Sequence, residues 1–519
     1  MLRTPRSLLR RSSGAAALVT AAGLALLGAT QASAGTTATG QVTTGVAAAS
    51  LTGSAAGWTG YGATVAYNAA GHAAPGSVAV TAGGTWTGGV SPQFAVTAGA
   101  RYTATGWAKA ATAAHSVGLA LRFRNAQGVV LDAGTQIAQG LTDSTTAWTQ
   151  LAPVVGFAPA GAVKAEIVAL DFDGAKGDVQ LFDDFGVQAT TGTAVKLAAP
   201  LTTRGNAVYD ANGKKVTFRG IDVDGLQYPA TGKVSTTEIS AARSWGANFV
   251  RIPLAENPVL PGDCSYDAGY LGKVDALVQA ATSQGMVALL DLHTNAVKAC
   301  AAPAQQAMPD AKAVTFWQTV AGRYKSNPLV AFDLYNEPHD VTDAVWRNGG
   351  TVTSGGVTYT APGMQQLYAT VRGTGATNLI VASGTNWASS FPTQAPLTGA
   401  TNLIYGVHAY TCPSATPAQG GSCNPGPGGV LDASTILNRF SAASASVPVM
   451  LTEFGWPDAY DGRYVASVID SVTARGWVGW DVYAFDNSTA GRFNLVKDTS
   501  ATPDPSPAGM AVMTRMAAG

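Results

Sequence analysis

Residues 329–338 read Leu329-Val330-Ala331-Phe332-Asp333-Leu334-Tyr335-Asn336-Glu337-Pro338. Apolar residues at nearly every position of a short run are typical of a parallel strand that is buried on both faces. This run ends on an amide and a carboxylate, Asn336 and Glu337. In a closed barrel of alternating strands and helices, the carboxyl ends of the strands hold the reactive groups. The run therefore predicts a buried parallel strand that places a carboxylate at the rim of an active site.

The chain from residue 201 to residue 519 repeats this pattern, because apolar runs alternate there with amphipathic stretches. The predicted strands are Val216–Val223, Phe249–Leu254, Met286–His293, Leu329–Glu337, Asn378–Trp387, Leu403–Tyr410, Pro448–Trp456 and Trp477–Phe485. The predicted helices include Thr236–Ser244, Val274–Gln284, Ala311–Tyr324, Met364–Thr370 and Tyr464–Ala474. Eight apolar strands with helices between them predict a (β/α)8 TIM barrel over residues 201–519, with a small hairpin at Arg204–Lys215.

Polar or aromatic side chains stand near the ends of most of these strands. The run Pro448-Val449-Met450-Leu451-Thr452-Glu453 ends on a second glutamate. The further groups of this kind are Arg251, His293, His408, Tyr410 and Trp480. One such histidine or arginine is usually explained by packing or by an ion pair, but several on one rim are not. Two strand-end glutamates are the pair that hydrolysis of a glycosidic bond requires.

On these residues, the chain from 201 to 519 resembles the retaining β-glycanases of glycoside hydrolase family 5. The matching segments are Asn248-Phe249-Val250-Arg251-Ile252-Pro253, Asp291-Leu292-His293, Asn336-Glu337-Pro338, Val407-His408-Ala409-Tyr410, Thr452-Glu453-Phe454-Gly455 and Trp480. All eight positions characteristic of the family's active site find a partner, in the family's order and on the expected strands. This ordered set is much more specific than Asn-Glu-Pro alone.

The resemblance implies a role for each of these residues. Glu337 matches the catalytic acid/base, and Glu453 matches the nucleophile that forms a glycosyl-enzyme. The side chains expected to bind the substrate or to orient the carboxylates are Arg251, His293, Asn336, His408, Tyr410 and Trp480. The resemblance also implies that Trp480 offers a flat face to the sugar at the cleavage site. Two carboxylates roughly 5 Å apart predict retention of the anomeric configuration, without any metal or organic cofactor.

The substrate class is less sharply indicated than the chemistry. We expect an endo-β-1,4-glucanase (a cellulase) with a polysaccharide substrate, and a β-mannanase or another β-glucanase of the same family is the alternative. An inactive carbohydrate-binding protein is the alternative from another class. Endo or exo action, and hydrolysis or transglycosylation, stay open.

Lys plus Arg and Asp plus Glu both number 31, so no excess of positive charge indicates a nucleic-acid partner. We expect a monomer.

Residues 36–190 have a different character, with many short alternating runs between Gly and Asp turns. This pattern predicts an antiparallel β-sandwich. The segment resembles the jelly-roll carbohydrate-binding modules attached to polysaccharide hydrolases, through Pro75-Gly76-Ser77-Val78, Arg101-Tyr102-Thr103 before Trp107, and Phe182-Asp183-Asp184-Phe185. Trp58, Tyr61 and Trp86 are candidate platforms for sugar rings, or else core aromatics. Asp171, Asp173 and Asp178 either line a calcium site or belong to metal-free turns. Residues 191–200 are the predicted linker.

The first 34 residues are predicted to be a signal peptide, with a basic start, an apolar segment and the Ala32-Ser33-Ala34 cleavage pattern. We therefore expect a secreted protein without a membrane anchor after cleavage, exported by either the Sec or the twin-arginine route.

Four cysteines in an exported chain indicate two disulfides. The expected pairs are Cys264–Cys300 and Cys412–Cys423. A zinc site is disfavoured because no CxxC spacing is present.

Overall fold

The computed structural model describes residues 51–519 except 52, 99, 132–135, 139, 160, 191–195, 230–234, 411–432, 456–461, 488–492, 501–502, 504 and 518–519. The predicted signal segment and the predicted pair Cys412–Cys423 lie outside the described residues. The other predicted pair, Cys264–Cys300, is confirmed as a disulfide. Among the described helices, none has both the length and the apolar character needed to cross a membrane.

The N-terminal part is built from antiparallel strands, as predicted. The strands are β1 (Thr59–Tyr61), β2 (Ala63–Asn68), β3 (Ser77–Ala82), β4 (Thr87–Val90), β5 (Phe94–Ala95), β6 (Arg101–Ala110), β7 (Ser116–Arg124), β8 (Gln136–Ile137), β9 (Leu141–Thr142), β10 (Thr149–Gln150), β11 (Val154–Phe157), β12 (Lys164–Asp171) and β13 (Val179–Thr190). They form one sheet in the order β1-β4-β12-β7-β8 and a second in the order β10-β6-β13-β3-β2, with β5, β9 and β11 added at their sides.

Side-chain alternation explains how these two sheets enclose a core. Along β6 every second residue is buried, so that Tyr102 and Ala104 face inward while Thr103 and Thr105 are half-exposed. Residues on one strand point alternately to opposite faces of the sheet, so only one face of β6 is buried. The aromatic ring of Phe182 on β13 is fully buried in the same core. The prediction of an all-β N-terminal part is therefore confirmed.

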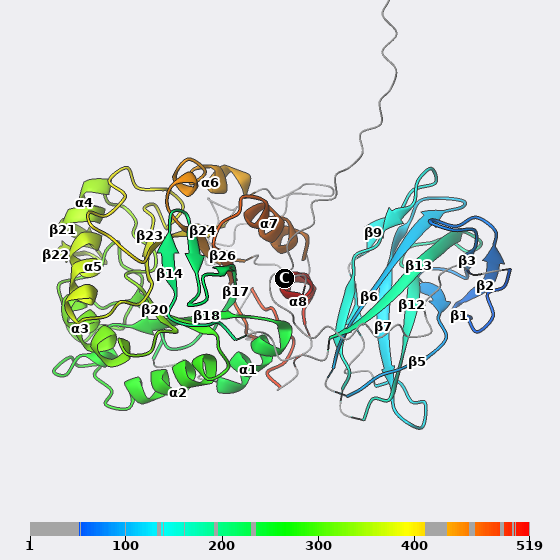
Figure 1. Cartoon of the computed structure of the whole chain (residues 1–519), viewed down its shortest axis with the longest axis horizontal. Helices are drawn as coiled ribbons and strands as arrows, with labels where there is room; N and C mark the ends of the chain where they lie inside the picture. Colours follow the sequence, from blue (N-terminus) through cyan, green and yellow to red (C-terminus); the bar gives the residue numbers. More distant parts are fainter. Residues whose placement is uncertain are drawn as a thin grey trace, which may run out of the picture. The chain divides into compact units, whose positions relative to one another are not determined.

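The C-terminal part is a closed parallel barrel of eight strands (Figure 1). In barrel order these are β17 (Phe218–Asp222), β18 (Phe249–Ala255), β19 (Val287–Thr294), β20 (Val330–Asp333), β23 (Ile380–Ser383), β24 (Leu403–Ala409), β25 (Val449–Phe454) and β26 (Gly479–Val482). The chain order of the strands is also their spatial order, as expected for repeated strand–helix units with right-handed connections. All eight predicted strands are present, so the predicted TIM barrel is confirmed.

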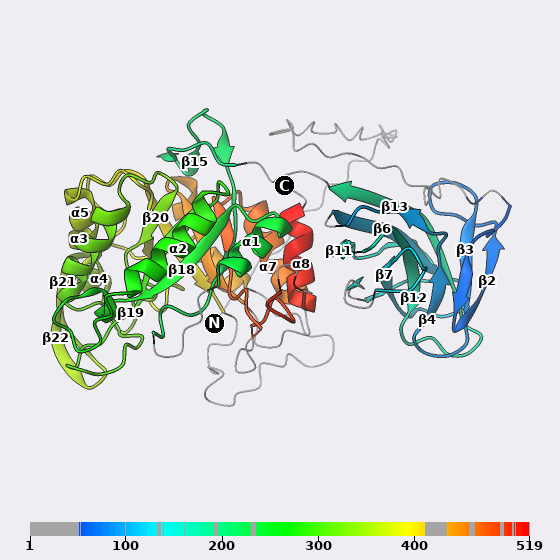
Figure 2. The same ribbon diagram turned by 90° about the horizontal axis from the view of Figure 1, so that it is seen from below.

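Helices lie outside the barrel strands (Figure 1). They are α1 (Thr236–Trp245), α2 (Tyr270–Thr282), α3 (Lys312–Tyr324), α4 (Asp343–Asn348), α5 (Met364–Gly373), α6 (Ser434–Asn438), α7 (Gly462–Ala474) and α8 (Pro507–Ala517), with short 3-10 turns η2 (Asn257–Val259) and η4 (Ala443–Ala445). Helix α2 packs against β18 and β19 (Figure 2). The Ser235 side chain accepts a hydrogen bond from the Glu238 N–H at the start of α1, and Gly246 ends that helix at a φ of 111°.

Two small sheets accompany the barrel. One consists of β14 (Thr202–Arg204), β15 (Ala207–Tyr209) and β16 (Lys215–Val216), where the sequence predicts a hairpin. The other is the hairpin of β21 (Gly349–Ser354) and β22 (Val357–Pro362), which the sequence analysis does not predict. The barrel interior below the strand ends is filled by apolar side chains such as Phe218, Phe249 and Leu289. This packed layer is a rigid base for the polar residues at the carboxyl ends of the strands.

Candidate active site

The two strand-end glutamates lie beside each other. Glu337 follows β20 by four residues, and Glu453 is on β25. One carboxylate oxygen of Glu337, one of Glu453 and a ring nitrogen of His408 all lie within 4.8 Å of one another. His408 Nδ1 is 2.8 Å from Glu337 Oε1 and 3.8 Å from Glu453 Oε2. The imidazole of His408 therefore lies between two carboxylates that are close enough to act on one bond.

Glu453 is held in its ionised form. Arg251 Nη1 donates to Glu453 Oε2 at 2.7 Å, and the Tyr410 hydroxyl donates to Glu453 Oε1 at 2.7 Å. Burial alone would raise the pKa of Glu453, but the positive charges of His408, Arg251 and His293 outweigh burial and lower the pKa to about 2. The carboxylate is consequently negatively charged across the neutral and mildly acidic range.

His408 responds to the same charges in the opposite direction. Burial alone would lower the pKa of His408, but the negative charges of Glu453 and Glu337 outweigh it and raise the pKa. Burial also raises the pKa of Tyr410, and the neighbouring negative charge of Glu453 adds to this effect. Tyr410 thus stays a hydrogen-bond donor to Glu453, and His408 is favoured as a cation between the glutamates.

Arg251 is the central cation of the barrel mouth. It is fully buried, and its guanidinium contacts Asp222 at 2.8 Å and Asp291 at 2.9 Å in addition to Glu453. Its Nη2 also donates to Asn336 Oδ1 at 2.5 Å. A buried guanidinium satisfies several carboxylates at once because it has five N–H donors in a planar arrangement. Arg251 therefore fixes Asn336 and Glu453 relative to each other.

More buried carboxyl groups surround Arg251 than one guanidinium can neutralise. Burial raises the pKa of Asp222 to about 8, although the charge of Arg251 opposes the shift. Burial and the charge of Asp291 raise the pKa of Asp333 to about 7. Burial and the charge of Asp222 raise the pKa of Asp481 on β26 as well. Sequence reasoning misses Asp222, Asp333 and Asp481, although each is the only carboxylate of its strand.

Asn336 is oriented by three side chains. Besides Arg251, its amide nitrogen donates to Gln305 Oε1 at 2.9 Å and lies 3.4 Å from His293 Nε2. His293 Nδ1 in turn lies 2.7 Å from Asp291 Oδ2. Gln305 belongs to the connection between β19 and α3, and sequence reasoning does not predict it because this connection has no regular pattern. Arg251, His293, Asn336, His408 and Tyr410 are thus brought together with Glu337 and Glu453.

Trp480 is the one predicted site residue of the barrel that the structure does not bring to the site. Its side chain is 2% exposed and belongs to the hydrophobic core, so it has no free face for a sugar. Tyr483, three residues later, lies nearer the site, since its ring and that of Tyr410 both pack against Phe493. Burial raises its pKa, and the charges of Asp224, Asp222 and Glu453 add to that shift. The Tyr483 ring packs against Phe493 at 5.5 Å.

Trp387 is an exposed aromatic residue beside Glu337. Its ring is stacked on His339, with centroids 3.5 Å apart, while the residue is 45% exposed. The Trp387 N–H donates to the carbonyl of Pro338, the residue after Glu337. Asn386, Trp387 and Ala388 all have φ values between 52° and 59°. Three consecutive left-handed residues other than glycine are strained, and such strain is concentrated at functional sites.

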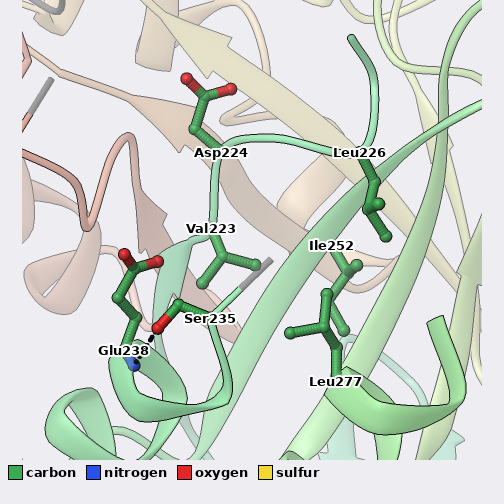
Figure 3. Close-up of a pocket in the computed structure, with 7 residues that line it drawn as sticks. All are labelled: Val223, Asp224, Leu226, Ser235, Glu238, Ile252 and Leu277. Carbon is green, nitrogen blue, oxygen red and sulfur yellow. Dashed lines mark hydrogen bonds between the residues drawn. The ribbon is translucent and has the colours of Figure 1, made fainter. Parts of the chain in front are cut away.

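A small hollow lies at the start of α1 (Figure 3). Its lining residues are Val223, Asp224, Leu226, Ser235, Glu238, Ile252 and Leu277. Its volume of about 10 Å³ has room for roughly one water molecule and none for a sugar ring. Neither Glu337 nor Glu453 lines it. The hollow is therefore separate from the candidate active site.

The predicted aromatic residues of the N-terminal part differ in exposure. Tyr61 is 48% exposed and Trp86 is 57% exposed. They lie close together, because Tyr61 pairs with Gly88 across β1 and β4 and Trp86 immediately precedes β4. Trp58 is half-buried and packs against Phe185 of the sandwich core at 4.8 Å. Tyr61 and Trp86 therefore lie near each other; Arg122 lies over the Tyr61 ring at 5.7 Å, and the Trp86 ring contacts Phe172 at 4.9 Å.

Known proteins match part of this chain. Manganese dependent endoglucanase Eg5A of Phanerodontia chrysosporium is 33% identical over 191 residues, which are 34% of this chain and 45% of that protein. Endoglucanase E-5 of Thermobifida fusca is 22% identical over 313 residues, 57% of this chain and 59% of that protein. The chain spans about half the length of the curated relatives it matches. A solved β-glucanase, SdGluc5_26A of Saccharophagus degradans, is 21% identical, covering 63% of this chain and 95% of its own, with a TM-score of 0.46.

The family match covers the site described above. The model of the family Cellulase (glycosyl hydrolase family 5) matches residues 209–486, which is more than half of the 519 residues. The matched range contains β17 to β26 and with them Arg251, Glu337 and Glu453. The chain therefore belongs to the cellulase family, glycosyl hydrolase family 5.

Proposed function

We propose that the protein is a retaining glycoside hydrolase that cleaves β-1,4-glucan internally. The observation that supports this most directly is the pair Glu337 and Glu453, with carboxylate oxygens within 4.8 Å of each other. Retaining enzymes hold their two carboxyl groups about 5 to 5.5 Å apart, whereas inverting enzymes leave room for a water molecule at roughly 6.5 to 9.5 Å. The short separation favours the double-displacement mechanism.

In this mechanism Glu453 is the nucleophile and Glu337 the acid/base. The ionised Glu453 attacks the anomeric carbon, while Glu337 gives its proton to the departing glycosidic oxygen. Glu337 then removes a proton from a water molecule, which breaks the bond between the sugar and Glu453. His408 contacts both carboxylates. It therefore stabilises the negative charge on Glu453 before the attack and on Glu337 after proton transfer. Asn336, fixed by Arg251, is suited to bond the sugar 2-hydroxyl.

Two observations support a β-1,4-glucan as the substrate. The relatives Eg5A and E-5 are both named endoglucanases. Trp387 presents an exposed ring near Glu337, since its N–H donates to the carbonyl of Pro338, the next residue. Sugar rings pack their C–H faces on aromatic rings, so a Trp at this place would bind glucose units beyond the cleaved bond. An aromatic contact beyond the catalytic carboxylates favours a polymer as the substrate.

The full chain is expected to hydrolyse carboxymethyl-cellulose and cellopentaose with retention. Proton NMR should detect the β-anomer of the new reducing end before mutarotation, and viscosity should fall faster than reducing ends appear. Faster turnover of β-mannan than of β-1,4-glucan would replace the cellulase proposal by the mannanase alternative. Initial release of the α-anomer would contradict the double-displacement mechanism. Binding of glycans without any hydrolysis would support the inactive carbohydrate-binding alternative.

We further infer that residues 36–190 form a glycan-binding module, that residues 1–34 are removed on export, and that the mature chain is secreted. The supporting observation for the module is the exposed pair Tyr61 and Trp86, which lie near each other. In affinity electrophoresis, β-glucan in the gel should retard the full chain, and Trp86→Ala should reduce this retardation several-fold. The matched control is Tyr266→Ala, which removes an exposed aromatic ring from the other part of the chain. Equal retardation of both variants would contradict the assignment of Trp86.

A further inference from the structure

His115 lies among four aspartates in the N-terminal sandwich. His115 comes directly before β7, and Asp171 ends β12. Asp173 and Asp178 belong to the connection from β12 to β13, and Asp143 follows β9. Ligand atoms of His115, Asp171 and Asp173 all lie within 4.8 Å of one another. Segments far apart in the sequence thus bring one imidazole and several carboxylates to a single place.

Each ring nitrogen of His115 faces a carboxylate. Nδ1 is 3.4 Å from Asp173 Oδ1, and Nε2 is 3.0 Å from Asp178 Oδ2. The backbone anchors the carboxylates as well, since Asp173 Oδ1 accepts from the Ser116 N–H at 2.8 Å. The side chain of His115 is 12% exposed. The ligand atoms are therefore held in place from several directions before anything binds.

Two buried carboxylates in this cluster each have an oxygen without a partner. Asp171 is 0% exposed, and its Oδ1 accepts from the Gly174 N–H, but its Oδ2 bonds to no described residue. Asp143 is 5% exposed, and its Oδ1 accepts from the His115 N–H, while its Oδ2 likewise has no partner among described residues. Buried polar atoms in folded proteins nearly always have a partner. Two such oxygens on carboxylates beside His115 point to a missing cation.

The charge of the cluster leads to the same conclusion. Four carboxylates lie around His115, and no lysine or arginine of the described chain forms an ion pair with any of them. Asp143 and Asp171 are both buried, and holding negative charges away from water costs free energy unless positive charge balances them. A bound divalent cation would supply the compensating charge and would remove this cost.

We propose that His115, Asp171 and Asp173 bind a divalent transition-metal ion. An imidazole together with carboxylates suits Mn²⁺ or Zn²⁺, whereas Ca²⁺ and Mg²⁺ take oxygen ligands. The metal ties the start of β7 to the end of β12 and to the following turn. Its effect is on the stability of the sandwich, so this proposal is independent of the proposed hydrolysis.

The test uses the full chain after treatment with EDTA and gel filtration. Titration with MnCl₂ and with ZnCl₂, followed by metal analysis, should give one equivalent bound and a rise in the midpoint of thermal unfolding. His115→Ala should lose both effects. Asp171→Asn, which keeps the shape and the hydrogen bond from Gly174, should weaken binding at least 10-fold while the chain still folds. His72→Ala is the matched control, because His72 also pairs with an aspartate of the sandwich, Asp184, at 2.6 Å.

The barrel contains a second group that can hold a metal, Glu337 with His408 and Glu453. The titration is therefore repeated with Glu453→Ala. Suppose that Glu453→Ala no longer binds metal while His115→Ala and Asp171→Asn still do. The ion would then lie in the barrel, and the proposal would be overturned. No metal bound by the intact chain at 1 mM of either salt would overturn it too. Stabilisation by CaCl₂ and by neither transition metal would overturn the assigned class of ion.

Discussion

Glu453→Ala is expected to lower kcat on cellopentaose by about 10⁴-fold or more, with little change in KM. The side chain that would form the covalent intermediate is then absent. Arg251 and Tyr410, which contact this carboxylate, would line the space it leaves. Sodium azide should restore turnover of an aryl β-cellobioside, because azide can enter the space left by the carboxylate. A single displacement by azide inverts the anomeric carbon, so the product should be the α-cellobiosyl azide.

Glu256→Gln is the matched control for this experiment. Glu256 is also a fully buried glutamate of the barrel, but it lies near Lys312, with Oε2 at 3.7 Å from Nζ, and away from Glu337. Its replacement should leave activity within a few-fold and should show no response to azide. Retained hydrolysis in Glu453→Ala at the level of Glu256→Gln would disprove the role of Glu453. A β-configured azide from Glu453→Ala would instead assign it the acid/base role.

The barrel and most of its rim are predictable from the sequence for a physical reason. A strand buried on both faces has to be apolar along its length, so an apolar run of this size is conspicuous. The carboxyl ends of parallel strands meet at one edge, so strand-end residues such as His293 and Glu453 converge even though they are far apart in the chain. Their hydrogen bonds to each other then follow from this convergence.

Trp480 shows where such reasoning fails. Both Trp480 and Tyr483 fall in the last predicted strand, and only the alternation of side chains distinguishes the inward residue from the outward one. Gly479 has a φ of 155°, which interrupts that alternation. Asp481 points to the barrel interior, since its Oδ1 would be 2.1 Å from a Cβ placed on Gly220 of β17. Its neighbour Trp480 therefore faces away from the interior, and Tyr483 turns toward Glu453.

The buried aspartates and Gln305 are unpredictable for a different reason. Asp222, Asp333 and Asp481 are each the only carboxylate of a strand, and a sequence does not tell which buried charges share a partner. Here one guanidinium, that of Arg251, is common to Asp222 and Asp291 and approaches Asp333 at 3.7 Å. Gln305 is placed by tertiary contacts, because the Tyr335 hydroxyl bonds the Gln306 carbonyl at 2.7 Å and so holds the loop.

Glu337→Ala should differ from Glu453→Ala in how its effect depends on the leaving group. General acid catalysis is worth about 10²- to 10⁴-fold, and a sugar leaving group needs it fully. Turnover of cellopentaose should therefore fall by about 10³-fold or more. A dinitrophenyl β-cellobioside needs no proton to depart, so its glycosyl-enzyme should form at nearly the normal rate and then accumulate. A pre-steady-state burst of dinitrophenol should be visible in Glu337→Ala and absent in Glu453→Ala.

Azide distinguishes the two carboxylates by the configuration of its product. In Glu337→Ala the nucleophile Glu453 remains, so azide would replace water in the second displacement and give the β-cellobiosyl azide after two inversions. Glu337→Gln is the conservative companion, because its amide keeps a polar contact for His408 Nδ1, now 2.8 Å from Glu337 Oε1, but has no acidic proton. Both variants should lose activity on cellopentaose alike. Normal activity in Glu337→Gln would mean that the contact to His408 matters and proton donation by residue 337 does not.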